Sequence, residues 1–240
     1  AKNIFIDNPY KKEDDLVLTL TESFRFGKEI ASVANVLLVK YKKEVDLVKG
    51  TNKEGFISIL DESEPYTIIT RTNAHLFDLA YDEVQKGRKI HIIGGYENLF
   101  NSVKDGYYLF IGEKDKIKSE FLKSFKNFFA FKEMVERVKM GEYKFLINIL
   151  EKYGDGILRA IVDMQKSIVG KKQADVTFVT AHKSKGLQFL NVRLANDFAE
   201  LFDKKGNEFE VESDEINLLY VAVTRAMERL EVNSQVRRLL

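Results

Sequence analysis

The chain has 240 residues, 45% of them hydrophobic and 31% charged, which is ordinary for a globular protein and enough for one large domain or two small ones. It has no Cys, which excludes disulfide bonds and thiolate metal sites. Its net charge of +1 does not favour nucleic-acid binding by the chain as a whole, so any such contact requires a local cationic patch.

The first part of the chain alternates predicted strands and helices. A helix should follow Gly27, because apolar residues recur at helical spacing from Ile30 to Leu38. A second should run from Asn73, as its cap, to about Gln85. Short β-type runs predict strands at 16–20, 56–60, 67–70 and 89–93. A strand, a helix and a second strand in this order form a right-handed parallel crossover, so this part predicts an α/β fold.

The pattern changes between residues 97 and 172, where β-branched runs vanish and apolar residues recur at helical spacing. We expect an all-helical insertion of three or four helices here. It includes an aromatic stripe whose spacing fits a buried helix face better than a base-stacking platform; its members are Phe121, Phe125, Phe128 and Phe129. The lysines of 114–126 are interpreted as a solvated helix face.

A loop at 180–189 holds two lysines, an imidazole and a glycine between two predicted strands, 176–179 and 191–195. Loops on a rigid scaffold often carry binding groups, and these side chains can donate hydrogen bonds to anionic oxygens. The loop therefore favours contact with phosphate or nucleic acid. A solvated turn that happens to hold two lysines is the alternative.

The last predicted helix runs from about Asp214 to Arg229, with Asp214 or Ser213 as its cap, and a final strand follows at 230–232. Arg225 interrupts an otherwise apolar stretch of this helix. An arginine in such a setting requires an anion, which is either a carboxylate of the protein or a phosphate. Because the helical block separates the strands, we expect a discontinuous α/β domain.

Several motif searches are negative. The chain has no G-x-x-x-x-G-K-[ST] phosphate loop. The histidines at 75, 91 and 182 lack the spacing of metal ligands, and Asp61-Glu62 is better explained as an acidic turn than as a Mg²⁺ ligand, so no metal site is predicted. No apolar run approaches the roughly 20 residues that span a bilayer, so no membrane partner is expected.

Three segments, in this order, resemble the second RecA-like domain of superfamily 1 helicases of the UvrD/Rep type: Leu20–Gly27, Thr180–Leu187 and Asn217–Ala226. The segment Ile69–Asn73, with Gly94-Gly95 further on, resembles the same family. The Ser-Phe-Arg-Phe-Gly block, the compact insert and the Asn-Leu-Leu-Tyr-Val-Ala-Val-Thr-Arg-Ala run look closest to its F-box DNA helicase branch. The resemblance covers essentially the whole chain and is weakest in the insert.

This resemblance implies a RecA-like (P-loop NTPase type) domain of residues 1–96 and 173–240, holding a helical insert subdomain of 97–172. It also implies that Arg25 and Arg225 are catalytic and reach the γ-phosphate of ATP, where a permanently charged guanidinium stabilises developing charge. The other residues that it places at the nucleotide are Phe24, stacked on the adenine, with Gly186 and Gln188. The family usually has Glu in place of Gln188, so the ribose contact here would lack a charge.

The resemblance further implies contacts to single-stranded DNA from Thr180 and His182, and from Arg71 with Asn73 at the other end of the sheet. Such contacts are made to the backbone and to stacked bases, so they tolerate any sequence and weaken with salt.

The function implied is the C-terminal motor portion of an ATP-dependent 3′–5′ DNA helicase or single-stranded DNA translocase. We expect a fragment whose partner is the N-terminal RecA-like domain of the same protein, which would bring the phosphate loop and hold most of the Mg²⁺ of ATP. The chain alone should hydrolyse no ATP. A cytoplasmic location is expected, at the nucleoid in a bacterium, or a nuclear one in a eukaryote. The alternative is a catalytically inactive helicase-like module that binds DNA or acts as a scaffold.

Overall fold

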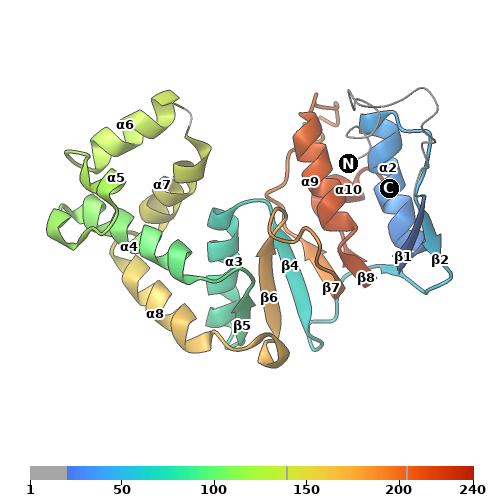
Figure 1. Cartoon of the computed structure of the whole chain (residues 1–240), viewed down its shortest axis with the longest axis horizontal. Helices are drawn as coiled ribbons and strands as arrows, with labels where there is room; N and C mark the ends of the chain where they lie inside the picture. Colours follow the sequence, from blue (N-terminus) through green and yellow to red (C-terminus); the bar gives the residue numbers. More distant parts are fainter. Residues whose placement is uncertain (1–20, 139, 204) are drawn as a thin grey trace, which may run out of the picture.

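The structure is a computed structural model that describes residues 21–138, 140–203 and 205–240. One half of the elongated molecule is a parallel sheet with its covering helices, and the other half is a group of helices (Figure 1). The strand predicted at 16–20 lies outside the described residues. The predicted fold class, an α/β fold of the RecA-like type with a parallel sheet interrupted by helices, is confirmed.

Six parallel strands form the main sheet within the described ranges, in the order β3 (Phe56–Ile57), β8 (Ala226–Glu231), β7 (Phe189–Leu194), β4 (Tyr66–Thr70), β6 (Val176–Thr180) and β5 (Ile90–Ile92). Strands β4 and β6 are buried along their whole length, as expected for parallel strands covered on both faces. A separate parallel pair joins β1 (Glu22–Gly27) to β2 (Lys49–Thr51). Since the six strands point the same way, the loops that connect them gather at the two ends of the sheet.

Helices cover both faces of the main sheet. On one face α2 (Lys28–Lys42) and α9 (Ser213–Val223) lie side by side (Figure 1), and α3 (Asn73–Gln85) packs on the other. The neighbouring residues Ile68 and Ile69 of β4 belong to two different hydrophobic cores. Successive side chains of a strand point to opposite faces, so this alternation is what divides the core in two.

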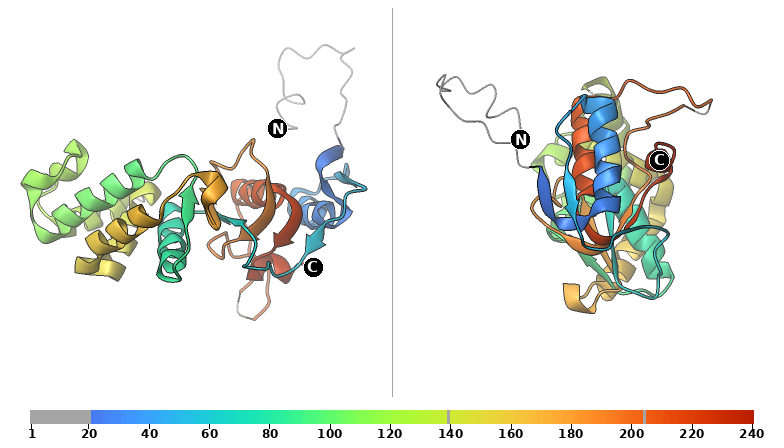
Figure 2. Two further views of the ribbon diagram at one scale, coloured as in Figure 1. Left: turned by 90° about the horizontal axis from the view of Figure 1, so that it is seen from below. Right: turned by 90° about the vertical axis from the view of Figure 1, so that its right-hand side faces the viewer.

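The helical block between β5 and β6 is confirmed, but the described residues contain five α-helices there, where three or four were predicted. Its α-helices are α4 (Glu97–Ile111), α5 (Glu120–Lys123), α6 (Phe128–Val138), α7 (Gly141–Tyr153) and α8 (Ile157–Ser167). They extend away from the sheet (Figure 2, left), yet they share one continuous hydrophobic core with α3. The division into two structural units at residues 97 and 172 stays a prediction. In the described residues no helix is long and apolar enough to cross a membrane.

Most of the aromatic stripe is helix core, as predicted. The ring centroids of Phe121 and Phe125 lie 5.1 Å apart, those of Phe125 and Phe131 lie 5.3 Å apart, and Phe128 packs against the same core. The assignment of Phe129 to this face was wrong, because its side chain is 73% exposed. It directly follows Phe128, and one helical step of about 100° rotates a neighbouring side chain out of the core.

Several predicted boundaries require correction. The helix predicted to reach Arg229 ends at Val223, and β8 occupies part of that range. The hydroxyl of Thr224 donates to the carbonyl oxygen of Tyr220 at 2.9 Å, a back-bond that competes with a further helical turn. Thr72, rather than Asn73, caps α3, and α9 has no side-chain cap. Only the first two residues of the strand predicted at 56–60 form a strand, and the N–H of Ser58 adds a hydrogen bond to the Leu230 carbonyl oxygen at 3.2 Å.

Candidate functional site

The residues predicted to carry function lie at two opposite ends of the main sheet. Gln188 precedes β7 and Arg225 precedes β8, which places both at the amino end of these strands. Arg71 follows β4, and Thr180 is the last residue of β6, which places both at the carboxyl end. The loop 181–188 runs from one end to the other, so it contributes to both groups.

At the amino end, the structure brings the predicted nucleotide residues together. We call this group the arginine cluster: Phe24, Arg25, Gly186, Gln188 and Arg225. Strand β1, which carries the first two, packs against β8. The Arg25 guanidinium donates from Nη1 to the carbonyl oxygen of Thr224 at 2.9 Å, and from Nε to Oε1 of Gln188 at 3.5 Å. Three segments far apart in the sequence therefore meet at one guanidinium.

Arg225 is held by neutral acceptors. Its Nε donates to the Val221 carbonyl oxygen at 2.9 Å, Nη1 to the Leu187 carbonyl oxygen at 3.1 Å, and Nη2 to the Thr224 hydroxyl at 3.1 Å. Burial and the positive charge of Arg25 together lower the pKa of Arg225 to about 10. The folded chain thus disfavours this charge, which an anion between the two guanidinium groups would stabilise.

No carboxylate within the described ranges lies at ion-pair distance from Arg25 or Arg225. The sequence left two explanations for Arg225, a carboxylate of the protein or an external phosphate. The carboxylate explanation finds no partner in this part of the chain. Two half-buried, uncompensated cations side by side have the character of an anion site.

The rest of the arginine cluster faces outward. The side chain of Phe24 is 76% exposed, so its ring is available for stacking, and Lys53 fixes its backbone by donating from Nζ to the Phe24 carbonyl oxygen at 3.0 Å. A cavity of about 440 Å³ lies beside Arg25 and is lined also by Lys53 and Phe56. Gly186 has φ +83°, a left-handed conformation that favours glycine, and nothing stands within 4 Å of where its Cβ would be.

At the carboxyl end, a cavity of about 840 Å³ is lined by all four residues predicted to contact DNA, Arg71, Asn73, Thr180 and His182. We call it the carboxyl-end cavity. Lys144 and Phe145 of α7 and Lys183 of the loop also line it, so the insert and the sheet both contribute to its wall. The four predicted residues therefore share one surface, although they come from two different loops.

The four residues predicted to contact DNA differ in how far their side chains are exposed. Asn73 and His182 are exposed, whereas Thr180 is buried at 7% exposure and presents little of its side chain. Burial is the main cause that lowers the pKa of His182, followed by the charges of Arg71 and Lys185. Its imidazole therefore offers one neutral donor and one acceptor at neutral pH.

Arg71 is not free. It forms a bidentate pair with Glu215 of α9, with Nη2 2.6 Å from Oε1 and Nε 2.9 Å from Oε2. Its pKa is raised, first by these hydrogen bonds, while the pKa of Glu215 is lowered by the same contact. The backbone N–H groups of Arg71 and Thr72 donate to the two carboxylate oxygens of Asp197, at 2.9 and 2.8 Å. The loop after β4 is thus fixed by two acidic residues.

Sequence reasoning missed Glu215, Asp197 and Thr224, each of which binds a predicted site residue. Glu215 lies in the first turn of α9, where an acidic residue needs no further explanation than the helix dipole. The only sequence signal was that Glu215 lies in the predicted helix 214–229, which also contains Arg225. Its partner Arg71 is 144 residues away, a pairing that periodicity cannot indicate.

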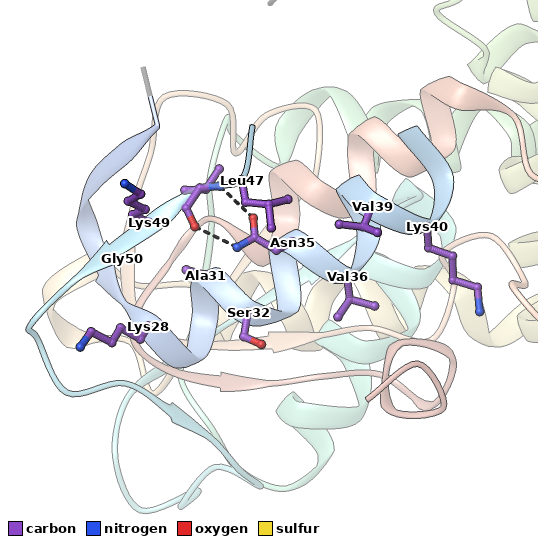
Figure 3. Close-up of a pocket in the computed structure, with 11 residues that line it drawn as sticks. Lys28, Ala31, Ser32, Asn35, Val36, Val39, Lys40, Leu47, Lys49 and Gly50 are labelled. Carbon is purple, nitrogen blue, oxygen red and sulfur yellow. Dashed lines mark hydrogen bonds between the residues drawn. The ribbon is translucent and has the colours of Figure 1, made fainter. Parts of the chain in front are cut away.

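Another hollow, of about 690 Å³, lies between α2 and β2 and holds none of the predicted residues (Figure 3). Val36, Val39 and Leu47 give it an apolar floor, and lysines lie at its rim. Asn35 exchanges two hydrogen bonds of 2.9 Å with the backbone of Val48, which attaches the chain after α2 to that helix.

Comparison with known proteins shows a matching family and similar relatives. A family profile described as UvrD-like helicase C-terminal domain matches residues 66–236. The chain is 33% identical over 244 residues to F-box DNA helicase 1 of Gallus gallus, covering 92% of this chain and 24% of the relative. It is 29% identical over 245 residues to F-box DNA helicase protein 1 of Schizosaccharomyces pombe, covering 92% of this chain and 28% of the relative. The chain thus spans about a quarter of the length of these curated relatives.

Proposed function

The chain belongs to the UvrD-like helicase C-terminal domain family, and from this premise we propose that it is the C-terminal motor portion of an ATP-dependent DNA helicase. The helicase translocates 3′ to 5′ on single-stranded DNA. Residues 1–96 and 173–240 form the motor domain, and residues 97–172 form a helical subdomain. The compartment is the one that holds the DNA, the nucleus in a eukaryote or the nucleoid in a bacterium.

The observation that carries this proposal is the pair formed by Arg25 and Arg225. Both are held in place by neutral acceptors, and both lack a carboxylate partner in the described chain. Guanidinium groups in such a setting suit a polyphosphate, whose charge spreads over the transferred phosphoryl group in the transition state. In this role the two side chains stabilise the γ-phosphate of ATP while it leaves.

The neighbouring residues fit the other parts of a nucleotide. The exposed ring of Phe24 offers a face to the adenine, and Gly186 allows the phosphate or ribose to approach the backbone. Gln188 can bond the ribose hydroxyls through its amide, without the charge of a Glu. Arg25 and Arg225 supply positive charge and no oxygen ligands. The oxygen ligands of Mg²⁺ therefore come mainly from the N-terminal RecA-like domain of the same protein.

Single-stranded DNA crosses the carboxyl-end cavity. Asn73 and His182 are exposed there, and Lys144 and Lys183 add positive charge at its wall. These groups suit backbone phosphates, which agrees with a DNA-binding patch that is local in a nearly neutral chain.

Cycles of ATP binding and hydrolysis close and open the cleft between the two motor domains. While ATP is bound, the arginine cluster holds the γ-phosphate that the N-terminal domain also contacts. Hydrolysis removes that shared anion, and the domains separate. Each cycle then moves the strand along the carboxyl-end cavity. The described chain supplies only the arginine side of this site, so alone it should not turn over ATP.

The test mixes this chain with a separately produced N-terminal half and single-stranded DNA, and follows phosphate release. Arg225→Ala should abolish hydrolysis and leave DNA binding largely intact. Arg159→Ala is the control, since Arg159 is exposed on α8 in the helical insert and lies 3.9 Å from its ion-pair partner Asp163. Turnover that survives Arg225→Ala would overturn the arginine assignment. Absence of hydrolysis with verified binding between the two halves would favour an inactive DNA-binding or scaffolding module.

A further inference from the structure

The two ends of the sheet are joined by one rigid element, α9. Its first turn carries Glu215, which holds Arg71 at the carboxyl-end cavity, and the chain directly after its last residue carries Thr224 and Arg225 of the other site. The 11 residues of α9, at about 1.5 Å each, span about 16 Å. In the right-hand view of Figure 2, α9 and α2 run side by side over the sheet.

Helix α9 is packed against the core along its length. Its inward side chains Ile216, Leu219, Ala222 and Val223 are fully buried in the core that α2 shares. A close-packed interface of this kind moves between discrete positions rather than deforming gradually. A displacement of α9 at Glu215 would therefore also move Thr224. The Thr224 carbonyl oxygen accepts from Arg25, and its hydroxyl accepts from Arg225.

Arg71 is electrostatically satisfied in the described state. Two carboxylates raise its pKa, Glu215 by direct hydrogen bonds and Asp197 by its charge. Glu215 occupies the Nε–Nη2 edge of the guanidinium, so a DNA phosphate can bind Arg71 through that edge only by displacing Glu215. Asp197 is bound elsewhere, because it accepts from the backbone N–H groups of Arg71 and Thr72. In every side-chain hydrogen bond described for Glu215, the partner is the Arg71 side chain.

We propose that Glu215 is a positioning residue that couples the carboxyl-end cavity to the arginine cluster, with a single-stranded DNA phosphate displacing it from Arg71. This inference rests on the proposed function and adds the residue that links its two sites. Without DNA, Glu215 anchors the amino end of α9 to the loop after β4. When a phosphate takes its place, α9 is released from that anchor. Arg225, which follows its other end, and Arg25, which is bound to Thr224 there, then take up their positions on the nucleotide.

The test uses the full-length protein that contains this chain, a fluorescent oligothymidine and ATP. Glu215→Gln removes the charge that competes with phosphate for Arg71. DNA should then bind roughly three- to tenfold more tightly, with a salt dependence steeper by about one phosphate contact. Hydrolysis without DNA should rise, so the stimulation by DNA falls, while kcat at saturating DNA stays unchanged.

Asp214→Asn is the matched control. Asp214 is exposed, lies in the same turn of α9 and contacts only Asn217 among the hydrogen bonds described. Asp214→Asn removes the same charge as Glu215→Gln, and with it a similar interaction with the helix dipole, but it leaves the contact with Arg71 intact. The double variant Arg71→Gln/Glu215→Gln gives a second control, because the gain in DNA affinity should vanish once Arg71 is absent. Melting temperatures establish that each variant is folded.

The outcomes separate the two proposals. If the wild-type protein shows no DNA-stimulated hydrolysis, the proposed function fails, and the coupling fails with it. If the wild type is stimulated by DNA but Glu215→Gln matches Asp214→Asn in affinity and in stimulation, only the coupling is overturned. A gain in affinity that persists in the double variant would also overturn it, since Glu215 would then act without Arg71.

Discussion

Arg25 and Arg225 both donate to Thr224, one to its carbonyl oxygen at 2.9 Å and the other to its hydroxyl at 3.1 Å. This shared acceptor fixes two like charges side by side, and burial together with the charge of Arg25 lowers the pKa of Arg225 to about 10. Such an arrangement is unfavourable by itself and becomes favourable when an anion binds between the two groups. A polyphosphate is the anion that the proposed function supplies.

The isolated chain should bind inorganic triphosphate through this pair. Because the anion binds only the folded state, millimolar triphosphate should raise the melting temperature by roughly 2–5 °C. The double variant Arg25→Gln/Arg225→Gln should lose this increase. Arg159→Gln, which replaces an exposed arginine of the helical insert, is the control and should keep it. An equal increase in all three proteins would show that the anion binds elsewhere.

The ring of Phe24 should contribute to nucleotide binding and not to the stability of the fold. Phe24 is 76% exposed and Phe26, two residues along the same strand, is 2% exposed. Phe24→Ala should leave the free energy of unfolding nearly unchanged and raise the KM for ATP of the full-length enzyme roughly three- to tenfold, the value of one stacking contact. Phe26→Ala should cost about 3–5 kcal/mol of stability. Denaturant titration and steady-state kinetics measure the two effects, and an unchanged KM for Phe24→Ala contradicts the stacking role.

The imidazole of His182 should report DNA binding through its protonation. Burial, Arg71 and Lys185 lower its folded pKa below the ordinary value of 6.5, while Glu215 opposes them. The unfolded chain therefore binds this proton more tightly. The contribution of His182 to stability is fully present above pH 6.5 and is lost as the pH falls through the folded pKa.

DNA phosphates would offset the positive charges of Arg71 and Lys185, so single-stranded DNA should raise the pKa of His182. NMR titration of the imidazole with and without oligothymidine measures this shift. A pKa of His182 that DNA leaves unchanged would remove this residue from the contact surface.

Gly94 should be required beside Lys183, a residue that lines the carboxyl-end cavity. It has φ +84°, and a Cβ there would lie 2.9 Å from Cδ and 3.0 Å from Nζ of Lys183. Gly94→Ala should therefore cost about 1 kcal/mol in backbone strain and also displace Lys183, which weakens DNA binding. Gly87→Ala shares the strain, with φ +81°, but nothing stands within 4 Å of its added Cβ.

Both glycine variants should lose similar stability in thermal melts, and only Gly94→Ala should bind single-stranded DNA less tightly. Equal DNA affinity for the two variants would mean that the position of Lys183 does not matter for binding.

Local patterns predicted most helices and strands of this chain. They failed where helical periodicity competes with strand pairing between distant residues. The stretch 217–230 is apolar enough for a helix throughout, so periodicity extended α9 too far. Pairing of β8 between β3 and β7 ends the helix, and that pairing depends on residues more than 30 positions away in the sequence. In the same way the short strand β2 is not among the strands that the local pattern predicted, since it is only three residues long and forms by pairing with β1.

The sequence by itself determined the α/β class, the helical insertion and the chemical types present in the functional loops, because these follow from local periodicity and residue identity. Only the tertiary structure decided which of these residues meet. It brings Arg25 to Thr224 across 199 positions and Arg71 to Glu215 across 144, and it places the two groups at opposite ends of one sheet. The physical reason is that ion pairs and shared acceptors are set by the packing of parallel strands under α9, and that packing is a property of the whole core.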